Sequence, residues 1–94
     1  MPRYERIDDI DSKTADLTRA RQSLIEEIEA MMFYDERASA TKDQILREIM
    51  IHNRDDEKEH AALLIEYLRR NDPEFDKELK EILFSSKEFN NLFD

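Results

Sequence analysis

The sequence predicts an all-α protein: an antiparallel hairpin of two long helices followed by a short C-terminal helix. The 94 residues contain no glycine and only two prolines, fewer turn-forming residues than a β-rich or α/β chain needs. Charged residues make up 41% of the chain and hydrophobic residues 39%, a mixture typical of helices with one face in water. Apolar residues also recur at steps of three and four along two long stretches.

The first helix is predicted over residues 12–37. It follows a polar stretch without periodicity at 1–11, which we expect to be an arm that is either flexible or docked on a partner. Residues 39–41 are expected to break the helix. Its predicted apolar stripe consists of Leu17, Ala20, Leu24, Ile28, Met31 and Tyr34.

The second helix is predicted over residues 42–70. Thr41 and Gln44 have the spacing of a capping box, so we expect Thr41 to cap the first turn. Because a short connection joins two long helices, the helices must run antiparallel. The stripe of the second helix consists of Leu46, Ile49, Met50, Asn53, Glu57, His60, Ala61, Leu64 and Leu68.

A short third helix is predicted over residues 73–84, with Asp72 as its cap and Pro73 at its first position. The tail at 85–94 is polar but has aromatic residues, and we expect it to dock on a partner or to pack back on the helices. We expect residues 1–94 to form a single domain. The apolar residues of the third helix and the tail are Phe75, Leu79, Ile82, Leu83, Phe89, Leu92 and Phe93.

The chain is expected to pair with a second copy of itself. A chain this short and this charged can bury only a small core alone. A helical hairpin also leaves each apolar stripe half covered. Two hairpins packed together would complete a four-helix bundle.

Charge and composition narrow the classes of partner and metal site. The net charge of −9 argues against nucleic acid or an anionic membrane and suits a protein that attracts cations, although acidic residues also serve solubility alone. Without cysteine, a metal must bind carboxylate, imidazole or backbone oxygen. No apolar run approaches the roughly 20 residues that span a bilayer, and the charged N-terminus does not resemble a signal peptide. We therefore expect a cytoplasmic protein.

Three polar side chains fall where the helix stripes should be apolar. Glu27 lies between Leu24 and Met31 on the first stripe, and Glu57 and His60 lie in the middle of the second. Residues three apart on a helix point to the same side, so Glu57 and His60 present a carboxylate and an imidazole together. Each of these residues alone is more often an edge or core residue than a ligand. A buried carboxylate, however, needs a proton, a cation or a metal as its partner.

The number of these residues matches half of a di-iron site. Carboxylate-bridged di-iron bundles use one Glu from each of two helices and a Glu-x-x-His pair from each of the other two. Two copies of this chain would supply that set as two Glu27, two Glu57 and two His60. Carboxylate and imidazole ligands suit iron or manganese, with zinc as a competitor.

Further polar residues on the same helices have two interpretations each. Tyr34 lies on the face of Glu27 and is either a hydrogen-bond partner for a bound ligand or part of the core. Glu26 and Glu29 either guide cations to the site or form a solvated acidic face. His52, with its neighbours Asp56 and Glu59, is interpreted as an exposed histidine rather than as a surface metal ligand.

Two segments of the sequence resemble the encapsulated ferritins, the ferritin-like cargo of encapsulin nanocompartments. The first is Glu-Glu-Ile-Glu-Ala-Met-Met-Phe-Tyr-Asp at 26–35, and the second is His-Asn-Arg-Asp-Asp-Glu-Lys-Glu-His-Ala at 52–61. A further match, Glu-Tyr-Leu-Arg-Arg-Asn-Asp, follows at 66–72, so the resemblance covers most of residues 15–84. Phe33 stands where the family pattern has tryptophan. We identify no shell-targeting peptide of the kind that the family usually carries in residues 85–94.

The resemblance implies a ferritin-like bundle and an activity. It implies a ferroxidase that oxidises Fe(II) to Fe(III) at a di-iron centre shared by two subunits, with calcium, manganese or zinc as ions that could replace iron. In the family pattern Glu27, Glu57 and His60 are the ligands, Tyr34 lies near the centre, and Glu26 and Glu29 line the metal entry. The resemblance also implies a ring of dimers, typically a decamer, inside an encapsulin shell that stores the iron. The alternatives are a non-catalytic helical oligomerisation module and a passive metal-binding protein.

Overall fold

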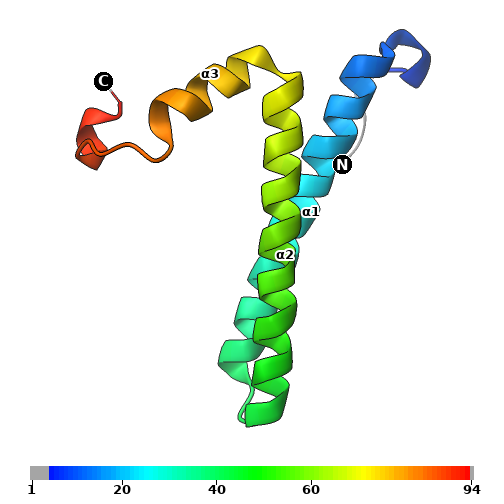
Figure 1. Ribbon diagram of the computed structural model, residues 1–94. Helices are drawn as coiled ribbons and strands as arrows, with labels where there is room; N and C mark the ends of the chain where they lie inside the picture. The colour runs from blue at the N-terminus through cyan, green and yellow to red at the C-terminus, as the bar shows by residue number, and fades with distance from the viewer. Residues whose placement is uncertain (1–4, 94) are drawn as a thin grey trace.

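A computed structural model describes residues 5–93 of the chain (Figure 1). Its elements in order are η1 (Ile7–Asp9), α1 (Ser12–Ala40), α2 (Gln44–Asn71), α3 (Pro73–Ile82) and η2 (Phe89–Asn91). The all-α class, with a two-helix hairpin and a short third helix, is confirmed. Part of the arm expected at 1–11, residues 1–4, lies outside the described residues, as does the last residue of the tail.

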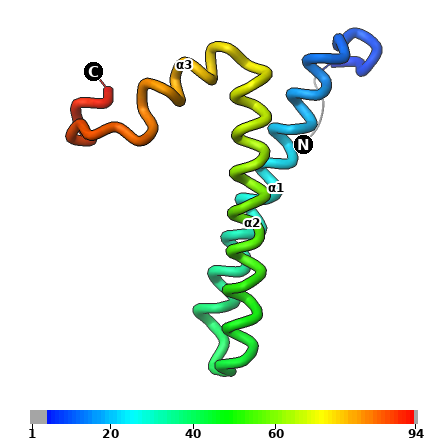
Figure 2. Tube along the Cα trace, viewed as in Figure 1, coloured from blue at the N-terminus to red at the C-terminus, as the bar shows by residue number. Residues whose placement is uncertain are grey.

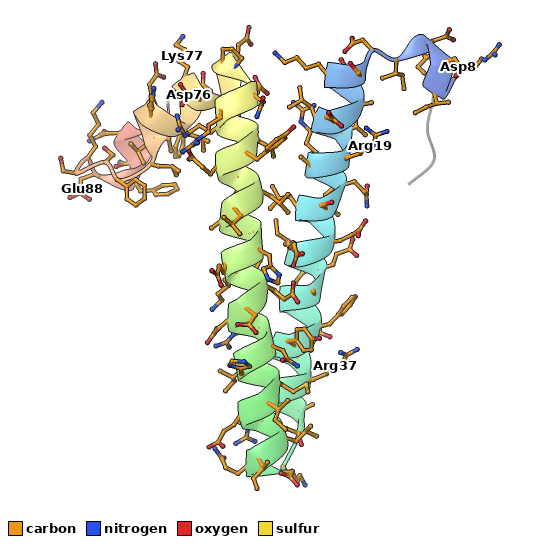
Figure 3. All side chains as sticks on the ribbon, turned by 45° about the vertical axis from the view of Figure 1, so that its right-hand side comes forward. Asp8, Arg19, Arg37, Asp76, Lys77 and Glu88 are labelled. Atoms are coloured by element: carbon orange, nitrogen blue, oxygen red, sulfur yellow. The ribbon has the colours of Figure 1, made fainter. Side chains whose placement is uncertain are left out.

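The hairpin of α1 and α2 forms the body of the molecule, and α3 leaves it at an angle. The trace in Figure 2 runs along α1, reverses direction and returns along α2. The two helices lie closest together near their connection and spread apart toward the other end, in both Figure 1 and Figure 3. From the end of α2, α3 projects away from α1 and carries the tail with it.

The connection between α1 and α2 differs from the prediction. Thr41 does not cap α2 and instead ends α1, where its backbone N–H donates to the carbonyl of Arg37. The cap of α2 is Asp43, whose carboxylate accepts from the N–H of Leu46 at 3.0 Å. The physical reason is that α1 continues to Ala40, so the chain can reverse only over residues 41–43. Arg47 donates to the carbonyls of Ala38 and Thr41 and so satisfies free acceptors at the end of α1.

Few side chains of the hairpin are fully buried, and most of these are small. On α1, the stripe that faces α2 includes Glu27 and not Ile28. Ile28 is exposed, so its place in the predicted stripe is wrong. The reason is that Ile28 is rotated by about 100° from Glu27 around the helix. The predicted stripe residues Leu46, Ile49 and His60 of α2 are also exposed, because each is rotated away from the part of α2 that faces α1. The buried apolar residues of the described chain are Ala15, Ala20, Ala38, Ala61 and Leu68.

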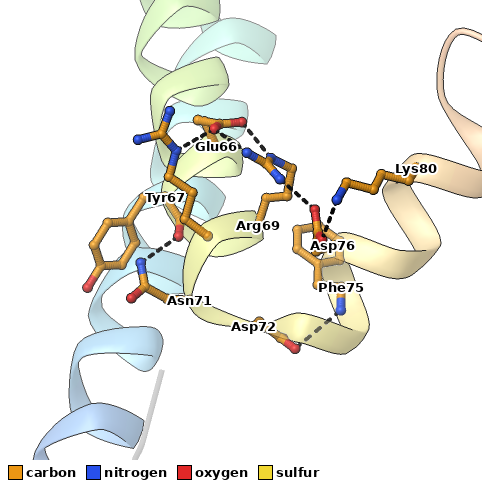
Figure 4. Close-up of polar contacts among 9 residues, drawn as sticks. Glu66, Tyr67, Arg69, Asn71, Asp72, Phe75, Asp76 and Lys80 are labelled. Atoms are coloured by element: carbon orange, nitrogen blue, oxygen red, sulfur yellow. Dashed lines mark hydrogen bonds and ion pairs between the residues drawn. The ribbon is translucent and has the colours of Figure 1, made fainter.

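Ionic contacts hold α3 against the end of α2 (Figure 4). The guanidinium of Arg69 donates to Glu66 on its own helix and, at 2.6 Å, to Asp76 on α3. Arg69, followed by Arg70, lowers the pKa of Glu66 to about 2, and Arg69 followed by Lys80 lowers the pKa of Asp76.

The ends of α3 are set by local contacts of the backbone. Asp72 accepts from the N–H of Phe75, with Pro73 at the first position of the helix, so the predicted cap is confirmed. The last helical residue is Ile82, earlier than predicted, because Leu83 already has an extended backbone, with φ of −75° and ψ of 146°. Phe84, which follows it, has a left-handed backbone with φ of 58°.

The chain leaves far more surface in solvent than a compact monomer of its size. A compact monomer of 11.3 kDa exposes about 5,700 Å², whereas this chain exposes 7818 Å². The radius of gyration is 17.3 Å, compared with about 12 Å for a compact domain of this length. Exposed large apolar side chains occur on all three helices and in the tail. Among the described residues, no helix has the combination of length and hydropathy that crossing a bilayer requires.

Candidate metal centre

Glu27, Glu57 and His60 come together across the hairpin. Glu27 comes from α1, and the other two residues come from α2. Nδ1 of His60 lies 3.5 Å from Oε2 of Glu27 and 3.5 Å from Oε2 of Glu57. One ligand atom from each residue lies within 4.8 Å of the others, so the group could hold a metal ion.

Helix periodicity explains how these side chains meet. The faces of α1 and α2 that pack against each other form a seam. On α1, Glu27 lies on this seam with Leu24 and Met31 one turn on either side, and Glu57 lies on the seam of α2. His60 is three residues after Glu57, so it shares the same side of the helix but is rotated toward the edge of the seam. The exposed fractions follow this geometry: 25% for Glu27, 22% for Glu57 and 51% for His60. The group is therefore open to solvent on the His60 side.

The carboxylate of Glu27 lacks a hydrogen bond on its inner oxygen. Oε2 of Glu27 is buried and has no hydrogen-bond partner among the described residues. The 3.5 Å contact with His60 is an ion-pair distance when His60 is protonated, and it does not meet hydrogen-bond geometry. Leaving a buried carboxylate oxygen unpaired is costly, and a bound cation would remove that cost. The donor set, two carboxylates and one imidazole, fits a divalent metal such as iron, manganese or zinc.

The open side of the group continues into an uncovered apolar surface on α2. Leu63 and Tyr67 follow His60 at three and seven residues, so they lie on the same face of the helix, and both are exposed. Ile49 is exposed on this face closer to the connection. His60 is thus a polar residue within an apolar surface that its own chain does not cover.

The other candidate residues lie outside this group. Tyr34 is half-buried two turns along α1 from Glu27, and the guanidinium carbon of Arg37 lies 5.7 Å from the centre of its ring. Glu26 and Glu29 are exposed, and Glu26 accepts a hydrogen bond from Gln22.

His52 is exposed, in agreement with its interpretation from the sequence. Its Nε2 lies 3.5 Å from a carboxylate oxygen of Asp56 on the same helix. Within the described part of the chain, His52 and Asp56 belong to no group of three potential metal ligands.

Sequence reasoning missed an ion pair on the seam near the site. Arg54 lies one turn before Glu57 and donates to Asp35 of α1 at 2.9 Å and to Asp55 at 3.1 Å. These carboxylates, Asp35 first, raise the pKa of Arg54, and Arg54 in turn lowers the pKa of Asp55. The spacing of Arg54 relative to Glu57 could have placed it on the seam. Spacing within α2 could not have identified a partner on α1.

Residues 2–86 of the chain match the EncFtn-like family. The chain belongs to the EncFtn-like family. The matched residues include the whole hairpin, the three-residue group and α3. The predicted resemblance to encapsulated ferritins is confirmed at this level.

Individual proteins are similar to this chain over most of its length. A ferritin-like protein of Thermotoga maritima is 48% identical over 84 residues, which are 89% of this chain and 74% of that protein. An encapsulated ferritin-like protein of Rhodospirillum rubrum is 43% identical over 82 residues, which are 87% of this chain and 59% of that protein. A crystal structure of a Nitrosomonas europaea protein is 49% identical, with a TM-score of 0.89 over 94% of this chain and 97% of that chain.

Proposed function

We propose that this protein is a ferroxidase that oxidises Fe(II) to Fe(III) at a di-iron centre shared between two copies of the chain. The observation that carries the proposal is the group of Glu27, Glu57 and His60, with ligand atoms within 4.8 Å of one another. Membership in the EncFtn-like family and the ferritin-like relatives support the same conclusion. In this proposal the two carboxylates and the imidazole are the iron ligands.

The sharing of the centre follows from its composition and its open side. One chain contributes two carboxylates and one imidazole, whereas a di-iron carboxylate bundle uses four carboxylates and two imidazoles. The group opens on the side of His60, where Leu63 and Tyr67 are uncovered. A second hairpin related by a two-fold axis would bring an identical group to this opening and cover the apolar surface. The product is a ferritin-like four-helix bundle.

The chemistry requires two Fe(II) ions as substrate and an oxidant. Each iron gives one electron, and the two electrons reduce dioxygen to hydrogen peroxide, or hydrogen peroxide to water. The negative carboxylates of Glu27 and Glu57 favour the more highly charged Fe(III), and neutral His60 completes a mixed oxygen and nitrogen ligand set. Glu26 and Glu29, exposed on α1, would raise the local concentration of Fe(II). Tyr34 is proposed to lie near the completed centre.

The proposed partner is an encapsulin shell. The Rhodospirillum rubrum relative is an encapsulated ferritin-like protein, so we propose the same enclosure for this chain, in a cytoplasmic nanocompartment. An open ring of dimers, expected to be a decamer, has no interior in which to store mineral. Oxidised iron would therefore pass to the shell.

The test combines mass, iron content and oxidation in one experiment. Metal-free protein receives Fe(II) without oxygen, its mass is measured, and air is then admitted while absorbance of the Fe(III)–oxo band is followed. Two irons per two chains and rapid oxidation are expected. Iron that binds but oxidises no faster than in buffer would indicate passive metal binding. Protein that binds no iron would contradict the proposed centre altogether.

Matched variants identify the ligands in the same experiment. Glu27→Gln and His60→Ala should lose rapid oxidation. Glu36→Gln and His52→Ala are the controls, because they make the same substitutions at exposed positions on the same helices. Wild-type rates in either ligand variant would contradict the assignment of that residue.

A further inference from the structure

A second uncovered feature of the molecule is a groove between α2 and α3. Its volume is about 500 Å³, and we call it the α2–α3 groove. Arg69 and Lys80 contribute to the lining, together with Glu66. The apolar part of the lining consists of Ala62, Ile65, Leu79, Leu83 and Phe84.

The α2–α3 groove lies on the opposite side of α2 from the exposed face of His60 and Leu63. At ~100° per residue, Ala62 is rotated by about 200° from His60, and Ile65 by about 200° from Leu63. Figure 1 shows α3 leaving α2 on the side away from α1, which is consistent with this placement. A hairpin that covered His60 and Leu63 would therefore leave the groove open.

The tail of the same chain carries an uncovered pair of aromatic rings. Phe89 and Phe93 pack edge to face with ring centres 6.0 Å apart, yet their exposed fractions are 76% and 66%. Among the elements of residues 5–93, η2 packs against no other helix. In Figure 3 the tail, marked by Glu88, lies beyond α3 on the side away from α1. We call residues 89–93 the aromatic turn.

Phe84, which lines the α2–α3 groove, has an unfavourable backbone conformation. Phe84 follows α3 with a left-handed backbone, φ of 58°, which is unfavourable for a bulky residue. Its side chain is fully exposed, so the described chain offers no contact that would compensate for this conformation. A contact with another chain would provide such compensation.

We propose that the aromatic turn of one copy docks in the α2–α3 groove of a second copy. The rings of Phe89 and Phe93 would enter the apolar part of the groove. Arg69 and Lys80 supply positive groups that can lie over aromatic faces. Lys80 could also pair with Glu88, which precedes the turn. The donor and the acceptor are different surfaces, so two copies can exchange tails reciprocally about a two-fold axis, or the contact can pass from chain to chain in rings or open chains. Between chains that already pair through the metal centre, either arrangement links dimers into larger assemblies.

The exposed area is large enough for this contact in addition to a dimer. The chain exposes about 2,000 Å² more than a compact monomer of its mass, given its 7818 Å² in total. A standard interface covers about 800 Å² of each partner. The excess therefore allows two different interfaces on each chain.

Disulfide trapping tests the docking directly, because the chain contains no cysteine of its own. Ala62→Cys places a thiol in the groove, and Asn91→Cys places one on the aromatic turn. The two single variants, one of them tagged, are mixed and oxidised mildly. A reducible product that contains one chain of each kind is expected, well above the yield for Asn91→Cys mixed with Glu48→Cys, whose thiol lies on α2 near the connection. Equal yields for the two mixtures would overturn the proposal.

The double variant Ala62→Cys/Asn91→Cys distinguishes a second copy from the chain's own tail. Disulfides that link different chains are expected. Closure only within single chains would mean that the turn folds into its own groove, which would also overturn the proposal.

Removal of the rings tests the consequence for assembly. The variant Phe89→Ser/Phe93→Ser should lose all assemblies larger than a dimer in native mass measurements, with unchanged helical circular dichroism. Unchanged assembly mass in this folded variant would contradict the docking. The result is independent of the ferroxidase proposal: iron titration of the same variant reports on the metal centre, and trapping and mass report on the groove.

Discussion

His60 on α2 and Glu27 on α1 meet across the hairpin, with 3.5 Å between Nδ1 and Oε2. The same oxygen of Glu27 is buried and has no hydrogen bond within the described chain. The carboxylate oxygen nearest the imidazole is thus a buried acceptor without a hydrogen bond. Such an arrangement is unfavourable for the metal-free protein and suited to a cation, and the first two predictions follow from it.

Replacing Glu27 by leucine should stabilise the metal-free protein and abolish metal binding. Leucine would continue the apolar seam and remove an unpaired acceptor, whose cost is about 1–3 kcal/mol. We expect the free energy of unfolding to rise by about 1 kcal/mol in urea titrations with chelator present. Glu36→Leu, at an exposed site of the same helix, is the control and should give no comparable gain. A less stable Glu27→Leu protein would show that the Glu27 carboxylate already has a satisfactory partner.

Metal binding should stabilise the fold and the pairing of chains together. A ligand that binds only the folded dimer at 100 times its dissociation constant adds about 2.7 kcal/mol. Mn²⁺ or Zn²⁺, which avoid oxidation, should raise the unfolding temperature and the fraction of dimer in sedimentation experiments. His60→Ala should remove both effects, and His52→Ala should retain them. A metal-induced rise in stability with no change in mass would show that one chain is sufficient to bind the ion.

The ionic contacts of Glu66 with Arg69 and Arg70, at the end of α2, should weaken in acid. Arg69 and Arg70 lower the pKa of Glu66 from 4.5 to about 2. A lowered carboxyl pKa contributes stability above the ordinary value, and this contribution disappears as the pH falls from about 4.5 to about 2. The difference in unfolding temperature between the wild type and Glu66→Gln should therefore be present at pH 6 and shrink to nearly zero at pH 2. Glu59→Gln controls for the loss of one negative charge on α2. A difference that stays constant with pH would argue against the Glu66 contacts.

The start of α2 should depend on Asp43 rather than on Thr41. Asp43→Ala removes the acceptor for the N–H of Leu46 and should cost about 1 kcal/mol of stability. Thr41→Ala removes only the contact of its hydroxyl with the N–H of Asp43, so its cost should be smaller. Thermal unfolding of both variants provides the comparison. The reverse order of stability would restore the capping box predicted from Thr41 and Gln44.

Features that depend on spacing within one segment were accessible from the sequence. Asp72 and Pro73 begin α3 as predicted, because a cap and a first-turn proline act through their own backbone. Glu57 and His60 lie on adjacent parts of one face because three residues nearly complete a helical turn. The position of Glu27 between Leu24 and Met31 followed from the same periodicity, which is why the three candidate ligands could be named before the structure was known.

Relations between segments were decided only by the tertiary structure. Periodicity allowed Ile28 as well as Glu27 on the stripe, and the rotation of α1 against α2 turned Glu27 inward and Ile28 outward. The partners of Arg54 on α1 and of Arg69 on α3 depend on where those helices lie, which spacing along α2 does not specify. The direction of α3 likewise created the α2–α3 groove. Local sequence determined which side chains share a helix face, and packing between helices determined what each face meets.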